Sequence, residues 1–147
     1  MSNVKTIPEG YHSVTPYLIV DQAAELIEFV QKAFGAEVLM KMTQPDGSVG
    51  HTEVRIGDSV VMISSARDQW KAMPTMLYLY VADADAVYGK ALEAGATSVQ
   101  PMQDQFYGDR SGGVRDVSGN YWYIATHQED MSEAELQRRK EAARGAH

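Results

Sequence analysis

The sequence contains no cysteine, which excludes disulfide bonds, thiolate metal sites and a cysteine nucleophile. It is also poor in positive charge, with 13 lysines and arginines against 20 acidic residues and a net charge of -7. Nucleic acids and anionic membranes require a basic face that such a chain lacks. No apolar run is long enough to span a bilayer, and residues 1–10 lack the apolar core of a signal peptide. We therefore expect a soluble, cytoplasmic protein with no nucleic-acid or membrane partner.

What the sequence does contain is the composition of a globular chain. Apolar residues make up 44% and aromatic residues 9% of its 147 residues, enough for one ordinary domain or for two half-size modules that share a core. We expect a flexible arm over residues 1–10, a single domain over 11–130 and a charged C-terminal helix or tail over 131–147. The tail contains Ser132 three residues before Glu135, which is the spacing of a helix capping box.

The dominant feature is a repeat. The stretch TPYLIVDQ at 15–22 has a counterpart in TMLYLYVADAD at 75–85. Adding 61 to a position in the first copy gives its partner in the second: Tyr17 and Tyr78, Leu18 and Leu79, Val20 and Val81. Both copies alternate in the manner of a strand and are followed by a helical pattern. The chain is therefore predicted to use one small unit twice.

Each copy of the unit predicts a strand, a helix and three further strands. The helices should end at Gly35 and Gly95, because glycine readily adopts the left-handed conformation that stops a helix. The first module is expected over 11–65 and the second over 75–127, joined by a linker at 66–74 whose large anchor is Trp70. In the second module, QDQFYGDRSGG is predicted to be a long connection, where the first module has a short turn.

This duplicated unit resembles the vicinal oxygen chelate superfamily, which includes glyoxalase I, extradiol dioxygenases and the bleomycin- and fosfomycin-resistance proteins. The resemblance is carried by YHSVTPYLIVD, GHTEVRIGDSVVM, DQFYGDRSGG and RDVSGNYWYIATHQED, and it is strongest to the PhnB-like, glyoxalase/bleomycin-resistance branch. It implies an α+β fold of two tandem βαβββ modules that form a curved mixed sheet with a central cavity and outer helices. It also implies a homodimer, which agrees with the need to cover open sheet edges.

Enzymes of this superfamily hold a divalent metal through four inward side chains, typically His, Gln or Glu, two from each module. The resemblance places these positions at Thr15, Met62, Met76 and Tyr123, and the 61-residue repeat gives the same pairing. None of the four is a normal ligand for a hard or borderline divalent ion. We therefore expect no metal cofactor, unless metal ligands have moved to other positions.

The cavity face of the strands is predicted to be rich in aromatic and thioether groups. Strand alternation assigns to it Tyr17, Ile19, Val60, Met62, Met76, Tyr78, Tyr80, Tyr121 and Tyr123. The alternate positions are expected to pack under the helices: Leu18, Val20, Val61, Ile63, Leu79, Val81, Trp122 and Ile124. Phenols stack on planar ligands and form hydrogen bonds, as in many small-molecule sites. The alternative is that these side chains fill the hollow themselves, and we favour a ligand pocket.

Polar candidates stand on the third strand of the first module. His51, Glu53 and Arg55 share one face of it. His51 and Glu53 could act as a general-base pair, or form a displaced metal site with His12 or Asp109. The interpretation that we favour is a surface charge ladder across neighbouring strands.

The long connection of the second module supplies further candidates. Phe106 and Tyr107 are expected at the rim of the pocket, where Arg110 could clamp a carboxylate or phosphate. Alternatively, Asp109 and Arg110 pair with each other and order the loop. His127 is interpreted as a surface histidine just past the last strand.

Three classes of function remain. The first is a metal-free protein that binds a small planar or hydrophobic compound. The second is a divalent-metal lyase, isomerase or dioxygenase with displaced ligands. The third is an inert module that serves dimerisation. We favour the first.

Overall fold

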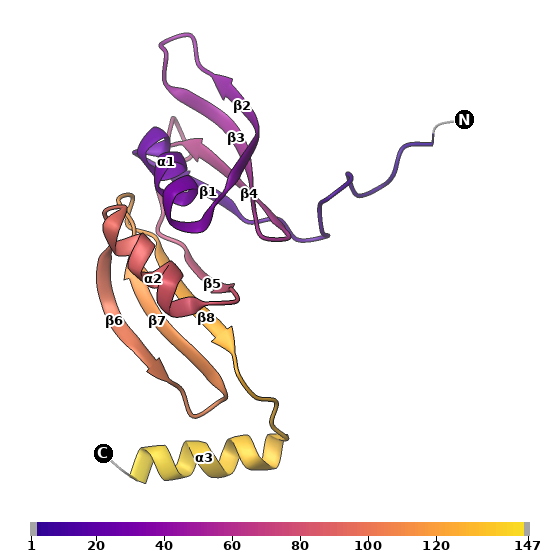
Figure 1. The fold of residues 1–147 in the computed structure, drawn as a ribbon. Helices are drawn as coiled ribbons and strands as arrows, with labels where there is room; N and C mark the ends of the chain where they lie inside the picture. Colours follow the sequence, from indigo (N-terminus) through magenta and orange to yellow (C-terminus); the bar gives the residue numbers. More distant parts are fainter. Residues whose placement is uncertain (1–2, 146–147) are drawn as a thin grey trace.

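The computed structural model describes residues 3–145, which form two βαβββ modules and a final helix (Figure 1). The first module comprises β1 (Tyr17–Val20), α1 (Ala23–Phe34), β2 (Glu37–Thr43), β3 (Val49–Ile56) and β4 (Ser59–Ser65). The second comprises β5 (Met76–Tyr80), α2 (Ala84–Glu93), β6 (Thr97–Asp104), β7 (Asp109–Arg115) and β8 (Tyr121–His127). Helix α3 (Glu133–Gly145) follows. The predicted α+β class and tandem modules are confirmed.

The strand pairing confirms the 61-residue repeat. The two sheets have the orders β1-β4-β3-β2 and β5-β8-β7-β6, so the first strand of each module lies parallel to its last strand. Tyr17 pairs with Met62 in the first sheet, and Tyr78 pairs with Tyr123 in the second. Both partners shift by 61 positions, and the two sheets therefore have the same register.

Short sequence signals set the helix ends. Gly35 ends α1 in the left-handed conformation, with φ of 67°. The side chain of Asp83 caps α2 by accepting a hydrogen bond from the Ala86 N–H at 3.2 Å. Ser132 Oγ accepts one from the Glu135 N–H at 3.1 Å and so caps α3. Helix α1 has no such cap, because Gln22 is its N-cap residue and makes no side-chain cap bond.

A single hydrophobic core joins the modules. Helices α1 and α2 pack against each other where the modules meet (Figure 1). Phe34 of α1 contacts Trp122 of β8, with ring centroids 4.8 Å apart. The predicted alternation is confirmed at its centre: Leu18, Val20, Ile63, Trp122 and Ile124 are almost completely buried. Burial of this apolar surface is the main force that holds the fold together.

The eight strands form two separate four-stranded sheets rather than one continuous curved sheet. Within residues 3–145 the two sheets exchange no ladder hydrogen bonds, and helices α1 and α2 form the main contact between the modules. The face of each sheet that is turned away from the helices therefore belongs to one module alone.

The region predicted as a long connection is mostly strand. Residues 97–104 and 109–115 pair as a β-hairpin with a short turn at 105–108. Its composition, rich in glycine and polar residues, suggested a loop. Those residues instead have roles in the hairpin, because a Cβ on Gly112 would lie 2.7 Å from Met102 Sδ and one on Gly113 would lie 2.9 Å from the Tyr123 ring.

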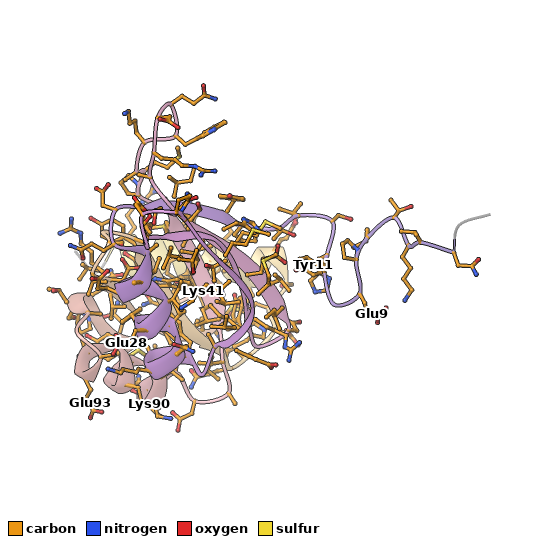
Figure 2. All side chains as sticks on the ribbon, turned by 90° about the horizontal axis from the view of Figure 1, so that it is seen from above. Glu9, Tyr11, Glu28, Lys41, Lys90 and Glu93 are labelled. Atoms are coloured by element: carbon orange, nitrogen blue, oxygen red, sulfur yellow. The ribbon has the colours of Figure 1, made fainter. Side chains whose placement is uncertain are left out.

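Residues 3–16 contain no helix or strand. The part around Glu9 extends away from the body of the molecule (Figure 2), whereas Pro16 contacts the first sheet, where its carbonyl accepts a hydrogen bond from the Met62 N–H. Residues 1–2 of the predicted arm and 146–147 of the predicted tail lie outside the described range. No helix within residues 3–145 is both long and apolar enough to cross a membrane.

Candidate functional site

The face of each sheet opposite the helices carries the predicted aromatic and thioether side chains. In one chain these groups remain accessible: Tyr17 is 47% exposed, Met76 63%, Tyr78 44% and Tyr80 58%. Met62, Tyr121 and Tyr123 are half-buried on the same faces. These side chains therefore do not fill a closed interior of this chain.

The first sheet and the linker form a cavity of about 470 Å³. Its lining consists of Tyr17, Ile19, Ser64, Ser65, Arg67, Trp70 and Met73. The linker is fixed over the sheet by paired backbone hydrogen bonds between Arg67 and Trp70, at 2.9 and 2.8 Å, and by the Met73 N–H donating to the Ile19 carbonyl at 3.1 Å. A mostly apolar hollow of this size with a few polar groups suits a small molecule.

Tyr17 connects this cavity to a polar pair on β3. Its Oη lies 3.2 Å from His51 Nδ1, and His51 Nε2 lies 2.7 Å from Glu53 Oε2. The Glu53 side chain is only 12% exposed. Arg55 does not take part, because it pairs with Glu37 on β2. The predicted charge ladder across strands is therefore right for Arg55 and wrong for His51 and Glu53, which pair along one strand and with Tyr17.

The positions at which the superfamily binds metal do not fit a metal ion here. Thr15 and Met62 line a hollow beside His12 and Glu53, but their hydroxyl and thioether are poor ligands for a divalent ion. Within residues 3–145, no three His, Asp or Glu side chains are grouped so that they could hold one.

The other two inherited positions, Met76 and Tyr123, lie on the second sheet. A displaced site that combines His51 and Glu53 with Asp109 is not formed, since Asp109 belongs to the other module and has partners there. Absence of a metal cofactor stays a prediction.

The second module has a polar centre that the sequence did not reveal. Asp109 is buried at the start of β7, with its side chain 3% exposed. Its Oδ2 accepts hydrogen bonds from Tyr78 Oη at 2.8 Å and Tyr80 Oη at 2.9 Å, while its Oδ1 lies 2.8 Å from His127 Nδ1. Burial raises the pKa of this carboxyl, but hydrogen bonds from His127, Tyr78 and Tyr80 outweigh it and hold the pKa below its usual value.

The pKa values of the three partners of Asp109 are raised rather than lowered. Burial, together with hydrogen bonds that include the one to Asp109, raises the pKa values of Tyr78 and Tyr80, so both remain neutral phenols. His127 is exposed, as predicted, but it is the last residue of β8 rather than a residue past the strand, and both of its ring nitrogens have carboxylate partners. Its Nε2 lies 2.7 Å from Asp130 Oδ1, and hydrogen bonds to Asp109 and Asp130 raise its pKa.

The β6–β7 turn does not form the predicted ligand clamp. Arg110 makes a bidentate pair with Asp85 of α2, at 2.7 and 3.0 Å, and also contacts Asp104 at 3.3 Å. The alternative pairing of Asp109 with Arg110 is wrong as well, because the two side chains point to different partners.

The two aromatic residues of the turn lie mainly beside α3. Phe106 and Tyr107 line a hollow against that helix rather than a pocket on the sheet. Tyr107 contacts the tyrosine cluster through its Oη, which lies 3.4 Å from Tyr78 Oη.

The structure thus gathers the predicted residues into two groups, one on each sheet. Tyr17, His51 and Glu53 form the first, and Tyr78, Tyr80 and Tyr123 lie in the second, with the Tyr78 and Tyr123 rings stacked 6.4 Å apart. In the part of the chain that the structure describes, no hydrogen bond or ring contact joins the two groups.

The sequence did not identify several residues of these sites: Ser64, Ser65, Arg67, Trp70 and Met73 of the cavity, and His127, the partner of Asp109. Trp70 had a signal, since a tryptophan in a polar linker suggests a contact surface. The Asp109–His127 pair becomes visible only once the register of β7 and β8 is known, because these residues are directly paired.

Comparisons with known proteins agree with this architecture. The sequence model of the Glyoxalase/Bleomycin resistance protein/Dioxygenase superfamily matches residues 10–124. An uncharacterized protein of Mycobacterium bovis, Mb0911c, is 36% identical over 136 residues, which cover 85% of this chain and 90% of that protein.

Solved structures show the same fold. TioX from Micromonospora sp. ML1 has a TM-score of 0.65 and 22% identity, covering 78% of this chain and 99% of that one. The PhnB protein of Bacillus cereus has a TM-score of 0.64 and 17% identity, with the same coverage of 78% and 99%. At these identities the similarity concerns the fold alone.

Proposed function

Since the chain belongs to the Glyoxalase/Bleomycin resistance protein/Dioxygenase superfamily, we propose that it is a cytoplasmic binding protein for a small planar or hydrophobic compound. The observation that carries this proposal is the cavity of about 470 Å³ beside β1, whose wall combines Tyr17, Trp70 and Met73 with two serine hydroxyls. Aromatic faces and a thioether suit a planar ligand, and hydroxyl groups give it orientation.

The proposed binding needs no metal ion. The inherited metal positions hold a hydroxyl, two thioethers and a phenol, which together are a poor cage for a divalent cation. Elemental analysis of protein purified without a chelator checks this directly. A stoichiometric divalent metal that is lost on substitution of His51 or Glu53 would contradict the metal-free mode and favour the enzymatic alternative.

The functional unit is proposed to be a homodimer. Both sheets expose aromatic and thioether side chains on the faces that the helices leave uncovered, and no further layer within residues 3–145 covers these side chains. A second copy of the chain would supply that layer. This arrangement would enclose the cavity and the tyrosine cluster together.

Tryptophan fluorescence tests the binding proposal, because Trp70 lines the cavity and is exposed whereas Trp122 is buried in the core. Titration with naphthol, indole and acridine should quench Trp70 saturably and raise the melting temperature. Trp70→Leu should remove the quenching and weaken binding about 2- to 12-fold, the equivalent of a stacking contact of about 0.5–1.5 kcal/mol.

Tyr88→Phe is the matched control. Tyr88 lies on α2, where its hydroxyl contacts Ser98 far from the cavity lining, and its loss should leave binding unchanged. If no compound in a broad aromatic panel gives a saturable response, the binding proposal fails and an inert dimerisation module is favoured.

A further inference from the structure

Tyr17, His51 and Glu53 form a continuous chain of hydrogen bonds that ends at the cavity. The carboxylate of Glu53 can only accept, so the nearby Nε2 of His51 carries a proton and donates it. In the neutral ring, Nδ1 is then an acceptor, and the hydroxyl of Tyr17 donates to it. Every proton in this chain therefore points from the cavity toward the carboxylate.

The sheet holds these three groups in a fixed arrangement. Tyr17 of β1 and Glu53 of β3 pair with the same residue of β4, Met62, from its two sides. His51 lies two residues from Glu53 and so projects from the same face of β3. Groups mounted on neighbouring strands are positioned more accurately than groups on loops.

Among the residues that the structure describes, the hydrogen-bond chain from a tyrosine through an imidazole to a carboxylate is found in the first module and not at the equivalent tyrosine of the second. Tyr78 and Tyr80 donate to the buried carboxylate of Asp109, with no imidazole between them. A phenol next to a carboxylate keeps its proton. A phenol next to a neutral imidazole can pass its proton on, because the resulting imidazolium is stabilised by the carboxylate behind it.

We propose that Tyr17, assisted by His51 and Glu53, is a catalytic acid–base group for proton transfer to and from carbon, and that its substrates are planar 2-oxo carboxylates. This inference rests on the proposed ligand cavity, and adds a reaction to it. Tyr17 is the catalytic residue, since it borders the cavity. His51 and Glu53 are positioning residues that act through it.

The cavity selects the substrate class. Arg67 is its only charged lining residue, and within residues 3–145 the guanidinium has no ion-pair partner. A second hollow that Arg67 also borders contains Asp46, whose carboxylate accepts hydrogen bonds from the Ser48 N–H and hydroxyl. A carboxylate would therefore pair with Arg67, while Trp70 and Met73 cover an aromatic or apolar group.

The proposed step moves protons and one electron pair. Tyr17 Oη takes a proton from the carbon next to the substrate carbonyl, while the phenolic proton passes to His51 Nδ1 and the imidazolium is held by Glu53. The electron pair of the broken C–H bond forms the enolate, whose charge lies near Arg67. The hydrogen that Tyr17 has taken up then exchanges with the solvent, and the reverse transfer returns a deuteron from deuterium oxide to the same carbon. The net reaction in deuterium oxide is therefore exchange of hydrogen for deuterium.

Proton NMR of phenylpyruvate in deuterium oxide measures this exchange at its methylene group. The protein should accelerate exchange well above the buffer rate, and Tyr17→Phe should lower kcat by about 10²- to 10⁴-fold, the usual contribution of general acid–base catalysis. His51→Gln and Glu53→Gln should lower kcat with KM unchanged. Arg67→Gln should raise KM, and Tyr88→Phe, outside the cavity, should change neither.

Trp70 quenching by phenylpyruvate and by 3-phenylpropionate, which has no carbonyl beside its methylene, separates binding from exchange. If the Tyr17→Phe variant still binds both acids but no longer accelerates exchange, the proposed proton transfer through Tyr17, His51 and Glu53 is supported. If the unchanged protein binds phenylpyruvate without accelerating exchange, or if Tyr17→Phe still accelerates it, the proposed proton transfer is wrong and the binding proposal stands. If neither acid binds but neutral aromatic compounds do, the proposed substrate class is wrong, and if nothing binds, both proposals fail.

Discussion

At the scale of single residues, tyrosines at equivalent positions differ in chemistry because different groups accept their protons. Tyr17 and Tyr78 are 61 residues apart and pair with equivalent residues. Tyr17 faces an imidazole, whereas Tyr78 donates to the buried carboxylate of Asp109. Asp109 is therefore the residue on which the order of the second module's polar centre depends.

Replacement of Asp109 by Asn should destabilise the fold. The substitution removes the buried charge that Tyr78, Tyr80 and His127 now share as hydrogen-bond partners. We expect the free energy of unfolding to fall by about 1–3 kcal/mol, measured by urea denaturation. Asp85→Asn removes an exposed carboxylate that pairs with Arg110 and should cause little change. Equal losses in both variants would contradict this role of Asp109.

The same centre gives stability a pH dependence on both sides of neutrality. The pKa of Asp109 is lowered by folding, so its contribution is present above the unfolded value near 3.8 and is lost as the pH falls through the folded pKa. The pKa of His127 is raised, so its contribution is present below 6.5 and is lost as the pH rises through the folded pKa. Melting temperatures of Asp109→Asn should accordingly vary less with pH than those of the unchanged protein.

The face of the sheet on which many single residues lie was predictable from strand alternation. Positions such as Leu18 and Ile63 alternate with Tyr17 and Met62, and the structure places the first pair in the core and the second pair on the open face. The partners of the open-face residues were not predictable, since His51 and Tyr17 are 34 residues apart and meet only through β4.

At the scale of elements, the β6–β7 hairpin depends on Gly108 in its turn. Gly108 has φ of 95°, and its carbonyl accepts hydrogen bonds from the N–H groups of Gln128 and Glu129. A Cβ at this position would lie 2.5 Å from the Glu129 carbonyl oxygen. The turn is thereby fixed to the segment that leads into α3.

Two glycine substitutions should have opposite effects. Gly108→Ala combines an unfavourable φ with a backbone clash and should lower the free energy of unfolding by more than about 1 kcal/mol. Gly89 lies inside α2, with nothing within 4 Å of the added Cβ, and Gly89→Ala should raise it by about 0.5–1 kcal/mol. Thermal or urea unfolding measures both. Stabilisation by Gly108→Ala would show that the turn is not constrained as described.

The boundaries of β7 show where sequence reasoning stops at this scale. Helices α1 and α2 and most strands follow apolar periodicity, and the predicted order of strand, helix and three strands in each module agrees with the structure. Strand β7 begins DRSGG, which has no apolar alternation. It forms because Asp109 and Ser111 are buried with partners and because Gly112 and Gly113 admit neighbouring side chains, which are tertiary contacts that a local pattern does not contain.

At the scale of the whole molecule, the helices join the modules and leave two aromatic faces open. Helices α1 and α2 form the contact between modules, and Glu28, Lys90 and Glu93 lie on their outer surface (Figure 2). Met76, Tyr78 and Tyr80 form an exposed apolar patch on the opposite side of the second sheet. Apolar patches of this kind commonly mark interfaces.

A charge placed on this face should separate the proposed dimer. We expect the unchanged protein to sediment as a dimer and Met76→Lys to sediment as a monomer, because a lysine there would be buried without a partner. Leu92→Lys adds the same charge at another exposed apolar position, on α2, and should leave the dimer intact. Analytical ultracentrifugation distinguishes these outcomes, and a monomeric unchanged protein at high concentration would exclude the homodimer.

The strict alternation of β1 and β4 also bears on how such a protein diverges. Neighbouring positions along these strands have different roles. Leu18 and Ile63 are buried in the common core, whereas Tyr17 and Met62 lie on the open face and each line a hollow there. The hollow lined by Tyr17 and the hollow lined by Met62 can therefore each change by single substitutions that leave the fold stable. A library randomised at positions 17, 19, 51 and 62 alone should therefore yield mostly well-folded variants with altered ligand preference. Because the module is duplicated, the open face of one module can change its chemistry while the other module keeps the original site.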